Sequence, residues 1–288
     1  MNIAHFNFAF WNTKWGTVNR TIDKFNHHLR KTIGYEMTEL NNSTLKRYKG
    51  KRFDVGICWG TREHYRILQD MCDNVLVFEN SYLNNVQGKN KEWISAGWNG
   101  LNGRADFCND NSPSDRWEKH FNDGRLLDYS DGDYILLPLQ IHNDMSLAHV
   151  ENKNYVKIAQ EIAKNTDLPI YVKQHPTRDD GQAHIYGKRI KYIDKNMPIE
   201  EAIKGAKAVV TINSNSGVDA VLGGKPVIAT DIGSMVYELS QKFEDLRNPS
   251  YPDRTQWCNN IAYAQWHPDE LASGEAWEHL KKKLVYKS

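Results

Sequence analysis

A short turn of small polar residues is the strongest chemical signal in the sequence. It spans residues 213–217, reads N-S-N-S-G, and follows the apolar run 208–212. At the start of a helix several backbone N–H groups lack partners and the helix dipole is positive, so phosphate groups bind there readily. The hydroxyls of Ser214 and Ser216 can add donors. Ser and Asn are also the preferred ordinary helix caps, so a structural cap remains an alternative.

A second polar group, Lys173-Gln174-His175-Pro176, follows another apolar run. Proline restricts the backbone after the predicted strand and holds His175 at its carboxyl end, the edge where open α/β sheets bind ligands. A histidine there can donate to a phosphate oxygen, and Lys173 can add positive charge. An ordinary surface histidine is the alternative, since His267-Pro268 shows that the dipeptide also occurs elsewhere.

The elements that position these residues alternate regularly in the second half of the chain. Apolar runs predict strands at 134–139, 168–173, 190–193, 208–212 and 227–230, with helices at 154–165, 198–205 and 216–222. This βαβαβ order predicts a nucleotide-binding half of the doubly wound α/β type.

The first half is less regular. It predicts strands at 2–10, 53–60 and 74–79 and helices at 17–32 and 62–72, again a strand–helix–strand unit. Residues 84–134 are rich in Asn, Gly, Asp and Trp and predict no regular element. Long stretches of this kind in a folded chain are usually functional.

Combined, these features resemble a known family. The segment 209–228 is similar to the stretch T-x-N-S-x-x-G-x-E-A-L-x-x-G-K-P-V of bacterial capsule-polysaccharide glycosyltransferases, the family that includes the Kdo transferases. Residues 136–140 resemble its L-P-L-Q strand, and 173–176 its K-x-H-P motif. The resemblance is good over about 134–240.

The resemblance implies an α/β fold of the GT-B type, with two Rossmann-like domains and a cleft between them. We expect an acceptor-side domain with a long aromatic loop at 1–130 and a nucleotide-sugar-binding domain at 131–255. Helices at 256–288 are expected to pack across the domains. The implied activity is transfer of a sugar from a nucleotide-sugar donor to an acceptor hydroxyl.

The resemblance also implies a catalytic carboxylate. Residues 78–83 look like the family motif E-D-G-F-L-R or E-x-G-Y-L-R, which makes Glu79 the first candidate general base. Here Asn80 stands in place of Asp, Ser81 replaces Gly, and Asn84 stands where Arg is expected. Asp106 is the second candidate base, and an ion pair is the alternative role of Glu79.

Negative charge grows on the departing nucleotide phosphate during sugar transfer, so the donor site needs hydrogen-bond donors and positive charge. We assign it these residues: Gln140, Lys173, His175, Asn213, Ser214, Ser216, Gly217 and Glu238. Such donors can replace a metal, so we expect no metal and no cofactor beyond the co-substrate. Asp131-Gly132-Asp133 precedes a strand and is interpreted as a turn, and Asp179-Asp180 is not assigned to a metal.

Composition excludes several classes of protein. The 288 residues are 40% hydrophobic and 25% charged, which is ordinary globular usage and excludes disorder as the main state. No apolar run approaches the roughly 20 residues of a membrane helix, and residues 1–10 lack a basic flank, so neither a membrane span nor a secretory signal is expected. The four cysteines are widely spaced, which favours free thiols and a cytoplasmic location.

The acceptor and the activity stay open at this point. Residues 1–52 hold ten Lys and Arg against three acids, a net charge of +7. With four tryptophans for stacking (Trp11, Trp15, Trp93 and Trp98), this leaves a hydroxymethylated base in DNA as an acceptor besides a glycan. A solvated face of a surface helix and ordinary packing of the tryptophans are the alternatives. A non-catalytic nucleotide or sugar-phosphate binder and a nucleotide-sugar epimerase are the alternative functions.

Overall fold

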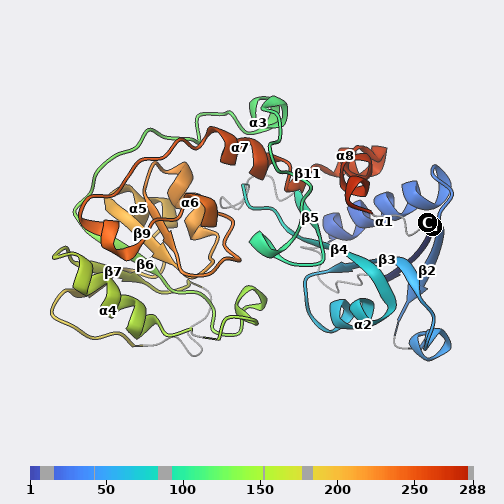
Figure 1. Cartoon of the computed structure of the whole chain (residues 1–288), viewed down its shortest axis with the longest axis horizontal. Coiled ribbons are helices and arrows are strands. Elements are labelled where there is room, and N and C mark those ends of the chain that lie inside the picture. Colours follow the sequence, from blue (N-terminus) through green and yellow to red (C-terminus); the bar gives the residue numbers. More distant parts are fainter. Residues whose placement is uncertain (7–15, 42, 84–92, 152, 177–183, 285–288) are drawn as a thin grey trace. The chain divides into compact units, whose positions relative to one another are not determined.

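The chain folds into two compact units. The computed structural model describes residues 1–6, 16–41, 43–83, 93–151, 153–176 and 184–284 (Figure 1). The first unit contains Met1–Ser112 and Asn260–Ser288, and the second contains Pro113–Asn259. The four cysteines are free, as the sequence predicts. No helix in the described ranges is long and apolar enough to cross a membrane.

The predicted domain boundaries at 130 and 255 both fall inside the second unit. Backbone hydrogen bonds explain this for the earlier boundary, since Leu127 N–H donates to the Leu222 carbonyl. The Arg254 guanidinium donates to the carbonyls of Val221 and Leu127 and so ties both linkers to the second unit. These contacts join residues between 33 and 127 positions apart, which composition along the chain does not reveal.

The first unit is built on a six-stranded sheet in the order β11-β5-β4-β3-β1-β2. Its strands are β1 (Asn2–Phe6), β2 (Glu36–Leu40), β3 (Phe53–Trp59), β4 (Cys72–Asn80), β5 (Ile94–Trp98) and β11 (Gln265–Trp266). Its helices are α1 (Gly16–Lys31), α2 (Glu63–Met71), α8 (Pro268–Ser273) and α9 (Glu275–Leu280). The strands β2, β1, β3 and β4 are parallel, whereas β5 and β11 form antiparallel pairs.

The C-terminal helices complete the core of this first unit. In Figure 1 the red helix α8 lies against the blue helix α1, and the Phe25 ring meets the Trp277 ring edge-on at 6.2 Å between centroids. The Trp98 indole N–H donates to the Leu280 carbonyl. From Asn260 onward these residues belong to the first unit, because β11 joins its sheet.

The second unit has a five-stranded, all-parallel sheet in the order β10-β9-β6-β7-β8. Its strands are β6 (Tyr134–Pro138), β7 (Ile170–Lys173), β8 (Ile190–Tyr192), β9 (Ala206–Thr211) and β10 (Val227–Ala229). Its helices are α3 (Asp115–His120), α4 (Tyr155–Asn165), α5 (Ile199–Lys204), α6 (Ser216–Leu222) and α7 (Thr255–Ala262), whose last three residues fall in the first unit.

Helices cover both faces of this second sheet. Ile135 and Leu137 of β6 pack in the same buried cluster as Ile158 and Ile162 of α4, while Leu136 packs with residues of α5 and α6 on the other face. A strand buried on both faces reads as a continuous apolar run, which is why the sequence predicted these strands well. The predicted doubly wound α/β arrangement is confirmed for this unit.

The interpretation of residues 84–134 as wholly irregular is wrong. They contain β5, which pairs with β4, and the short helix α3. The strand was missed because it has only five residues and includes Ser95 and Gly97. A Cβ at Gly97 would lie 2.6 Å from the Phe107 ring, so glycine lets this ring pack directly on the strand. Strand β2 was also not predicted.

Candidate functional site

The carboxyl ends of three neighbouring strands in the second unit carry a continuous network of buried polar side chains. Strands β6, β9 and β10 lie side by side, and the chain leaves all of them at the same edge because they are parallel. This is the edge at which doubly wound sheets bind ligands. Asn213, two residues after β9, lies at the centre of the network.

Asn213 and Gln140 form a reciprocal pair. The Gln140 Nε2 donates to Asn213 Oδ1 at 2.8 Å, and the Asn213 backbone N–H donates to Gln140 Oε1 at 3.1 Å. Both residues are buried. The Gln140 backbone N–H in turn donates to the hydroxyl of Tyr155 at the start of α4. Two residues assigned separately to the donor site are therefore brought into direct contact, and their pairing holds the loops after β6 and β9 together.

The other side of Asn213 faces residues that the sequence did not single out. Its Nδ2 donates to Asp231 Oδ2 at 2.6 Å and to the Ser146 carbonyl at 2.7 Å. His149 Nε2 lies 3.1 Å from the same Asp231 oxygen, which makes an ion pair when the imidazole is protonated. Asp231 is buried, whereas His149 is partly exposed. Asp231 is therefore held on one side by the buried Asn213 amide, and His149 on its other side is the end of the network nearest to solvent.

Asp231 could have been found from the sequence. It directly follows the predicted strand 227–230, and residues that follow strands of a parallel sheet gather at the ligand-binding edge. His149 and Ser146 carried no comparable signal, because they lie in an irregular segment between β6 and α4.

The serine turn folds as a compact cap for α6. The hydroxyls of Ser214 and Ser216 lie 2.9 Å apart, and Ser214 Oγ accepts from the Ser216 backbone N–H. Both side chains are partly exposed. Gly217 is buried, and a Cβ there would lie 2.9 Å from Val236, so glycine allows α6 to pack close to the segment after β10. The Ser214 hydroxyl thus caps the first residue of α6, whereas the N-cap residue Asn215 makes no side-chain capping bond.

Asp219, in α6, stands at the position of glutamate in the family stretch. Burial of this carboxyl raises its pKa from 3.8 to about 7, and the nearby Glu200 carboxylate adds to the effect. The folded protein therefore holds a proton that the unfolded chain releases in this range. Stability from this group is present below the unfolded pKa and is lost as the pH rises through the folded one.

We expect Asp219→Asn to flatten the pH dependence of stability. Each pH unit between the two pKa values costs the wild-type protein at most about 1.4 kcal/mol, because only the unfolded chain ionises there. At pH 8 the variant should therefore be more stable than the wild type, and at pH 4 the two should be similar. Urea unfolding at both pH values measures this, and an unchanged slope in the variant would contradict the assignment.

Lys173 and His175 lie at the end of β7, on the far side of β6 from the Asn213 turn. Two strand spacings, roughly 10 Å, separate the carboxyl ends of β7 and β9. Lys173 is buried, its ammonium donates to the Lys195 carbonyl at 2.8 Å, and burial lowers its pKa. His175 is partly exposed. The structure therefore uses Lys173 to hold the loop after β8, and His175 is the more accessible of the two.

Glu238 lies apart from the buried network. It is an exposed residue of the short helix Tyr237–Leu239 that follows β10. Its assignment to the donor site remains a prediction.

The G-K-P part of the family stretch has a structural role. Gly224 has a φ of +68°, and a Cβ there would lie 2.1 Å from the Asp128 carbonyl oxygen. Lys225 is 1% exposed, and its ammonium donates to the carbonyls of Ser130 and Asp131. Both residues therefore attach the segment before β6 to the turn before β10. Residues 131–133 form neither helix nor strand, in agreement with the predicted loop or turn, and Lys207 pairs with Asp131.

Glu79, the first candidate base, is the penultimate residue of β4 in the first unit. Its Oε1 accepts from the backbone N–H and the side-chain amide of Asn80, at 2.8 and 2.7 Å. The other carboxylate oxygen lies beside Gly60, which has a φ of +61°. Asn80, the departure from the family motif, thus donates to the carboxylate and orients it.

Asp106, the second candidate, is held in an ion pair. Its carboxylate lies 2.5 Å from the Lys283 ammonium and accepts from the Cys108 backbone N–H. Burial works against ionisation, but the bonds from Lys283 and Cys108 outweigh it and lower the pKa of Asp106. In the sheet, Glu79 lies opposite Ser95 of β5, and Asp106 lies opposite Trp98 of the same strand. These two positions are three residues apart along β5, a separation of roughly 10 Å. The two acids do not form one catalytic pair.

The structure describes two of the four tryptophans considered for stacking. Trp98 is 1% exposed and belongs to the core, so it is not available to stack on a base. Trp93 packs edge-on against His267. Trp11, Trp15, Asn84, Asp179 and Asp180 lie outside the described residues.

Comparison with known proteins confirms the family resemblance. Residues 114–240 match the model of the family described as "Capsule polysaccharide biosynthesis protein". The chain is similar to the capsule polysaccharide export protein KpsS of Escherichia coli, with 28% identity over 135 residues. That match covers 40% of this chain and 33% of the relative, so it spans about a third of the relative's length.

Two solved structures share the fold. They are Thermosulfurimonas dismutans KpsC domains titled beta Kdo 2,7 transferase and beta Kdo 2,4 transferase, with TM-scores of 0.56 and 0.57. The first is 16% identical, and the match covers 98% of this chain and 100% of that chain. The second is 15% identical, and the match covers 92% of this chain and 90% of that chain. At this identity the likeness shows the fold alone. The α/β, glycosyltransferase-like fold expected from the sequence is confirmed.

Proposed function

We propose, from the likeness of residues 114–240 to capsule polysaccharide biosynthesis proteins, that the chain transfers a sugar from a nucleotide-sugar donor to an acceptor hydroxyl of a glycan. The observation that carries the proposal is the polar network around Asn213 at the carboxyl ends of β6, β9 and β10. The matched region contains every residue assigned to the donor site. We place the reaction in the cytoplasm, where nucleotide sugars are the donors.

The proposed chemistry divides between the two units. In the second, the Ser214 and Ser216 hydroxyls and the accessible His175 are the groups suited to hydrogen-bond the departing phosphate, while Gln140 and Asn213 hold their loops in place. In the first, Glu79 is suited to accept the proton of the attacking hydroxyl, since Asn80 orients its carboxylate. Sugar transfer then needs no group beyond the two substrates and these side chains.

A nucleotide screen tests the donor site. We expect one of CMP, UDP or GDP to stabilise the protein by about 2.7 kcal/mol at 100 times its dissociation constant, a rise of several degrees in Tm. Ser214→Ala and His175→Ala should weaken the effect, whereas Asp106→Asn, in the first unit, should leave it unchanged. If none of the three nucleotides shifts Tm, the donor-site proposal is wrong.

A second candidate function is a non-catalytic nucleotide or sugar-phosphate binder. Two observations favour it: the curated relative is named an export protein, and Asn80 and Ser81 depart from the catalytic motif. Nucleotide binding without release of nucleotide from any nucleotide sugar, with or without glycan acceptors, would favour this function over transfer. Conversion of the donor alone into an epimer would instead indicate an epimerase.

A further inference from the structure

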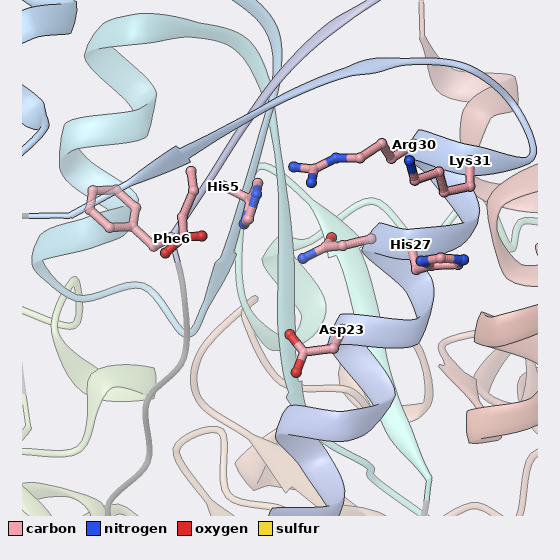
Figure 2. Close-up of a pocket in the computed structure, with 8 residues that line it drawn as sticks. His5, Phe6, Asp23, His27, Arg30 and Lys31 are labelled. Atoms are coloured by element: carbon pink, nitrogen blue, oxygen red, sulfur yellow. The ribbon is translucent and has the colours of Figure 1, made fainter.

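A polar pocket of about 240 Å³ opens in the first unit, at the carboxyl end of β1 (Figure 2). Residues of β1, α1 and β2 line it: His5, Phe6, Asp23, Asn26, His27, Arg30, Lys31 and Glu39. The Phe6 ring stacks on His64 at 4.0 Å and is 1% exposed, so it contributes little apolar surface to the pocket. The volume lies below the roughly 300–1,000 Å³ typical of drug-sized ligands, which suits one small ring.

Two buried polar groups of this pocket have no hydrogen-bond partner in the part of the chain that the structure describes. His5 is only 7% exposed, yet among the described residues neither of its ring nitrogens has a hydrogen-bond partner. The Oδ1 atom of Asn26 is also buried and without a partner there. Leaving such groups unpaired costs about 1–3 kcal/mol each, so structures rarely keep them without a reason.

A ligand that satisfies these unpaired groups must both donate and accept hydrogen bonds. Burial lowers the pKa of His5, so its neutral ring presents one donor and one acceptor nitrogen. Asn26 Oδ1 can only accept. A hydroxyl group satisfies either kind of partner, because it carries one donor and two acceptor lone pairs.

Charged residues of both signs surround these neutral groups. Arg30 and Lys31 are exposed cations on α1, and Figure 2 shows the Arg30 side chain extending from the helix toward His5. Asp23 is an exposed acid on the same helix, and Glu39 pairs in register with His5 across β1 and β2. A pocket with two acids beside two cations does not select a simple anion, and an apolar ligand would leave His5 and Asn26 unpaired.

We propose that this pocket binds a single sugar ring, with His5 and Asn26 hydrogen-bonding its hydroxyls and the exposed charged side chains contacting the others. The several hydroxyls of one ring can each donate and accept, and the pocket offers both kinds of partner. This site lies in the first unit and does not depend on the proposed nucleotide site or on sugar transfer.

Saturation-transfer NMR on the full chain tests the proposal with four probes at millimolar concentration: D-glucose, D-galactose, N-acetyl-D-glucosamine and D-glucuronate. At least one should receive saturation from the protein without any nucleotide present, and Asn26→Ala should remove most of that signal. Lys24→Ala, an exposed change on the same helix outside the pocket, is the control and should keep it. Absence of signal for all four sugars, or equal signal in Asn26→Ala, overturns the proposal.

His5→Phe separates a binding role from a structural one. Phenylalanine keeps an aromatic ring of similar size but removes the unpaired nitrogens, so Tm should stay equal or rise by roughly 2–4 °C while the sugar signal falls at least tenfold. A structural role for the imidazole would instead lower Tm. L-alanine is measured in the same way as a non-sugar probe. If it receives saturation and none of the sugars does, the pocket is an amino-acid site and the proposal is overturned.

Discussion

Replacing Glu79 with glutamine should lower sugar transfer by about 10²–10⁴-fold, the usual contribution of a general base. The amide keeps the shape of the side chain and an oxygen that can accept from Asn80, but it cannot take a proton. Nucleotide binding should be unchanged, because the groups assigned to the donor lie in the second unit. Single-turnover transfer measured beside nucleotide-induced Tm shifts separates the two effects.

Asp106→Asn is the matched control for this experiment. It makes the same chemical change at the other candidate acid, which the structure places in an ion pair with Lys283. We expect transfer to fall less than threefold. A large loss in Asp106→Asn with full activity in Glu79→Gln would reverse the assignment of the base, and full activity in both variants would remove both acids from the mechanism.

Replacing Asn213 with aspartate should destabilise the second unit by about 4 kcal/mol, within the range measured when a buried polar network loses a partner. The new carboxylate would face Asp231 Oδ2 at the position where Nδ2 now donates across 2.6 Å. It would also lose the donor to the Ser146 carbonyl. At this size of domain the change corresponds to a fall of roughly 8–16 °C in Tm.

Asn196→Asp is the control, since Asn196 is an exposed residue of the same unit. It should change Tm by less than about 2 °C, as surface substitutions usually do. Lowering the pH should partly rescue Asn213→Asp, because protonation of either carboxyl restores a hydrogen bond between them. Equal stability of Asn213→Asp and the wild type at neutral pH would show that the network does not hold the loops.

The strands of the second unit were predicted well for a physical reason. The strands β6, β7, β9 and β10 are largely buried and therefore read as apolar runs, whereas the edge strand β8 is more exposed. The polar residue that follows each run marks the carboxyl edge. This local signal was enough to select Asn213 and the serine turn, whereas Gln140 was selected through the resemblance of residues 136–140 to the L-P-L-Q strand. The local signal failed for β5, whose five residues pair antiparallel with β4. This strand includes Gly97, on which the Phe107 ring packs directly.

Pairing between distant residues was decided by the tertiary structure alone. Asn213 meets Gln140 across 73 positions, and Lys225 reaches carbonyls more than 90 positions earlier. The motif residues Gly224 and Lys225 attach β10 to the segment before β6. Asp106, a candidate base in the sequence, has Lys283 as its partner in the structure.

The sequence by itself determined which residues end the strands of the second unit, because burial and chain direction leave a local pattern of apolar runs and polar ends. Only the tertiary structure decided which of those residues touch, and only it revealed the pocket around His5. That pocket depends on the register that sets His5 beside Glu39 and on the face that α1 turns toward β1. Strand register and helix packing join residues far apart in the chain, and no spacing within one segment encodes them.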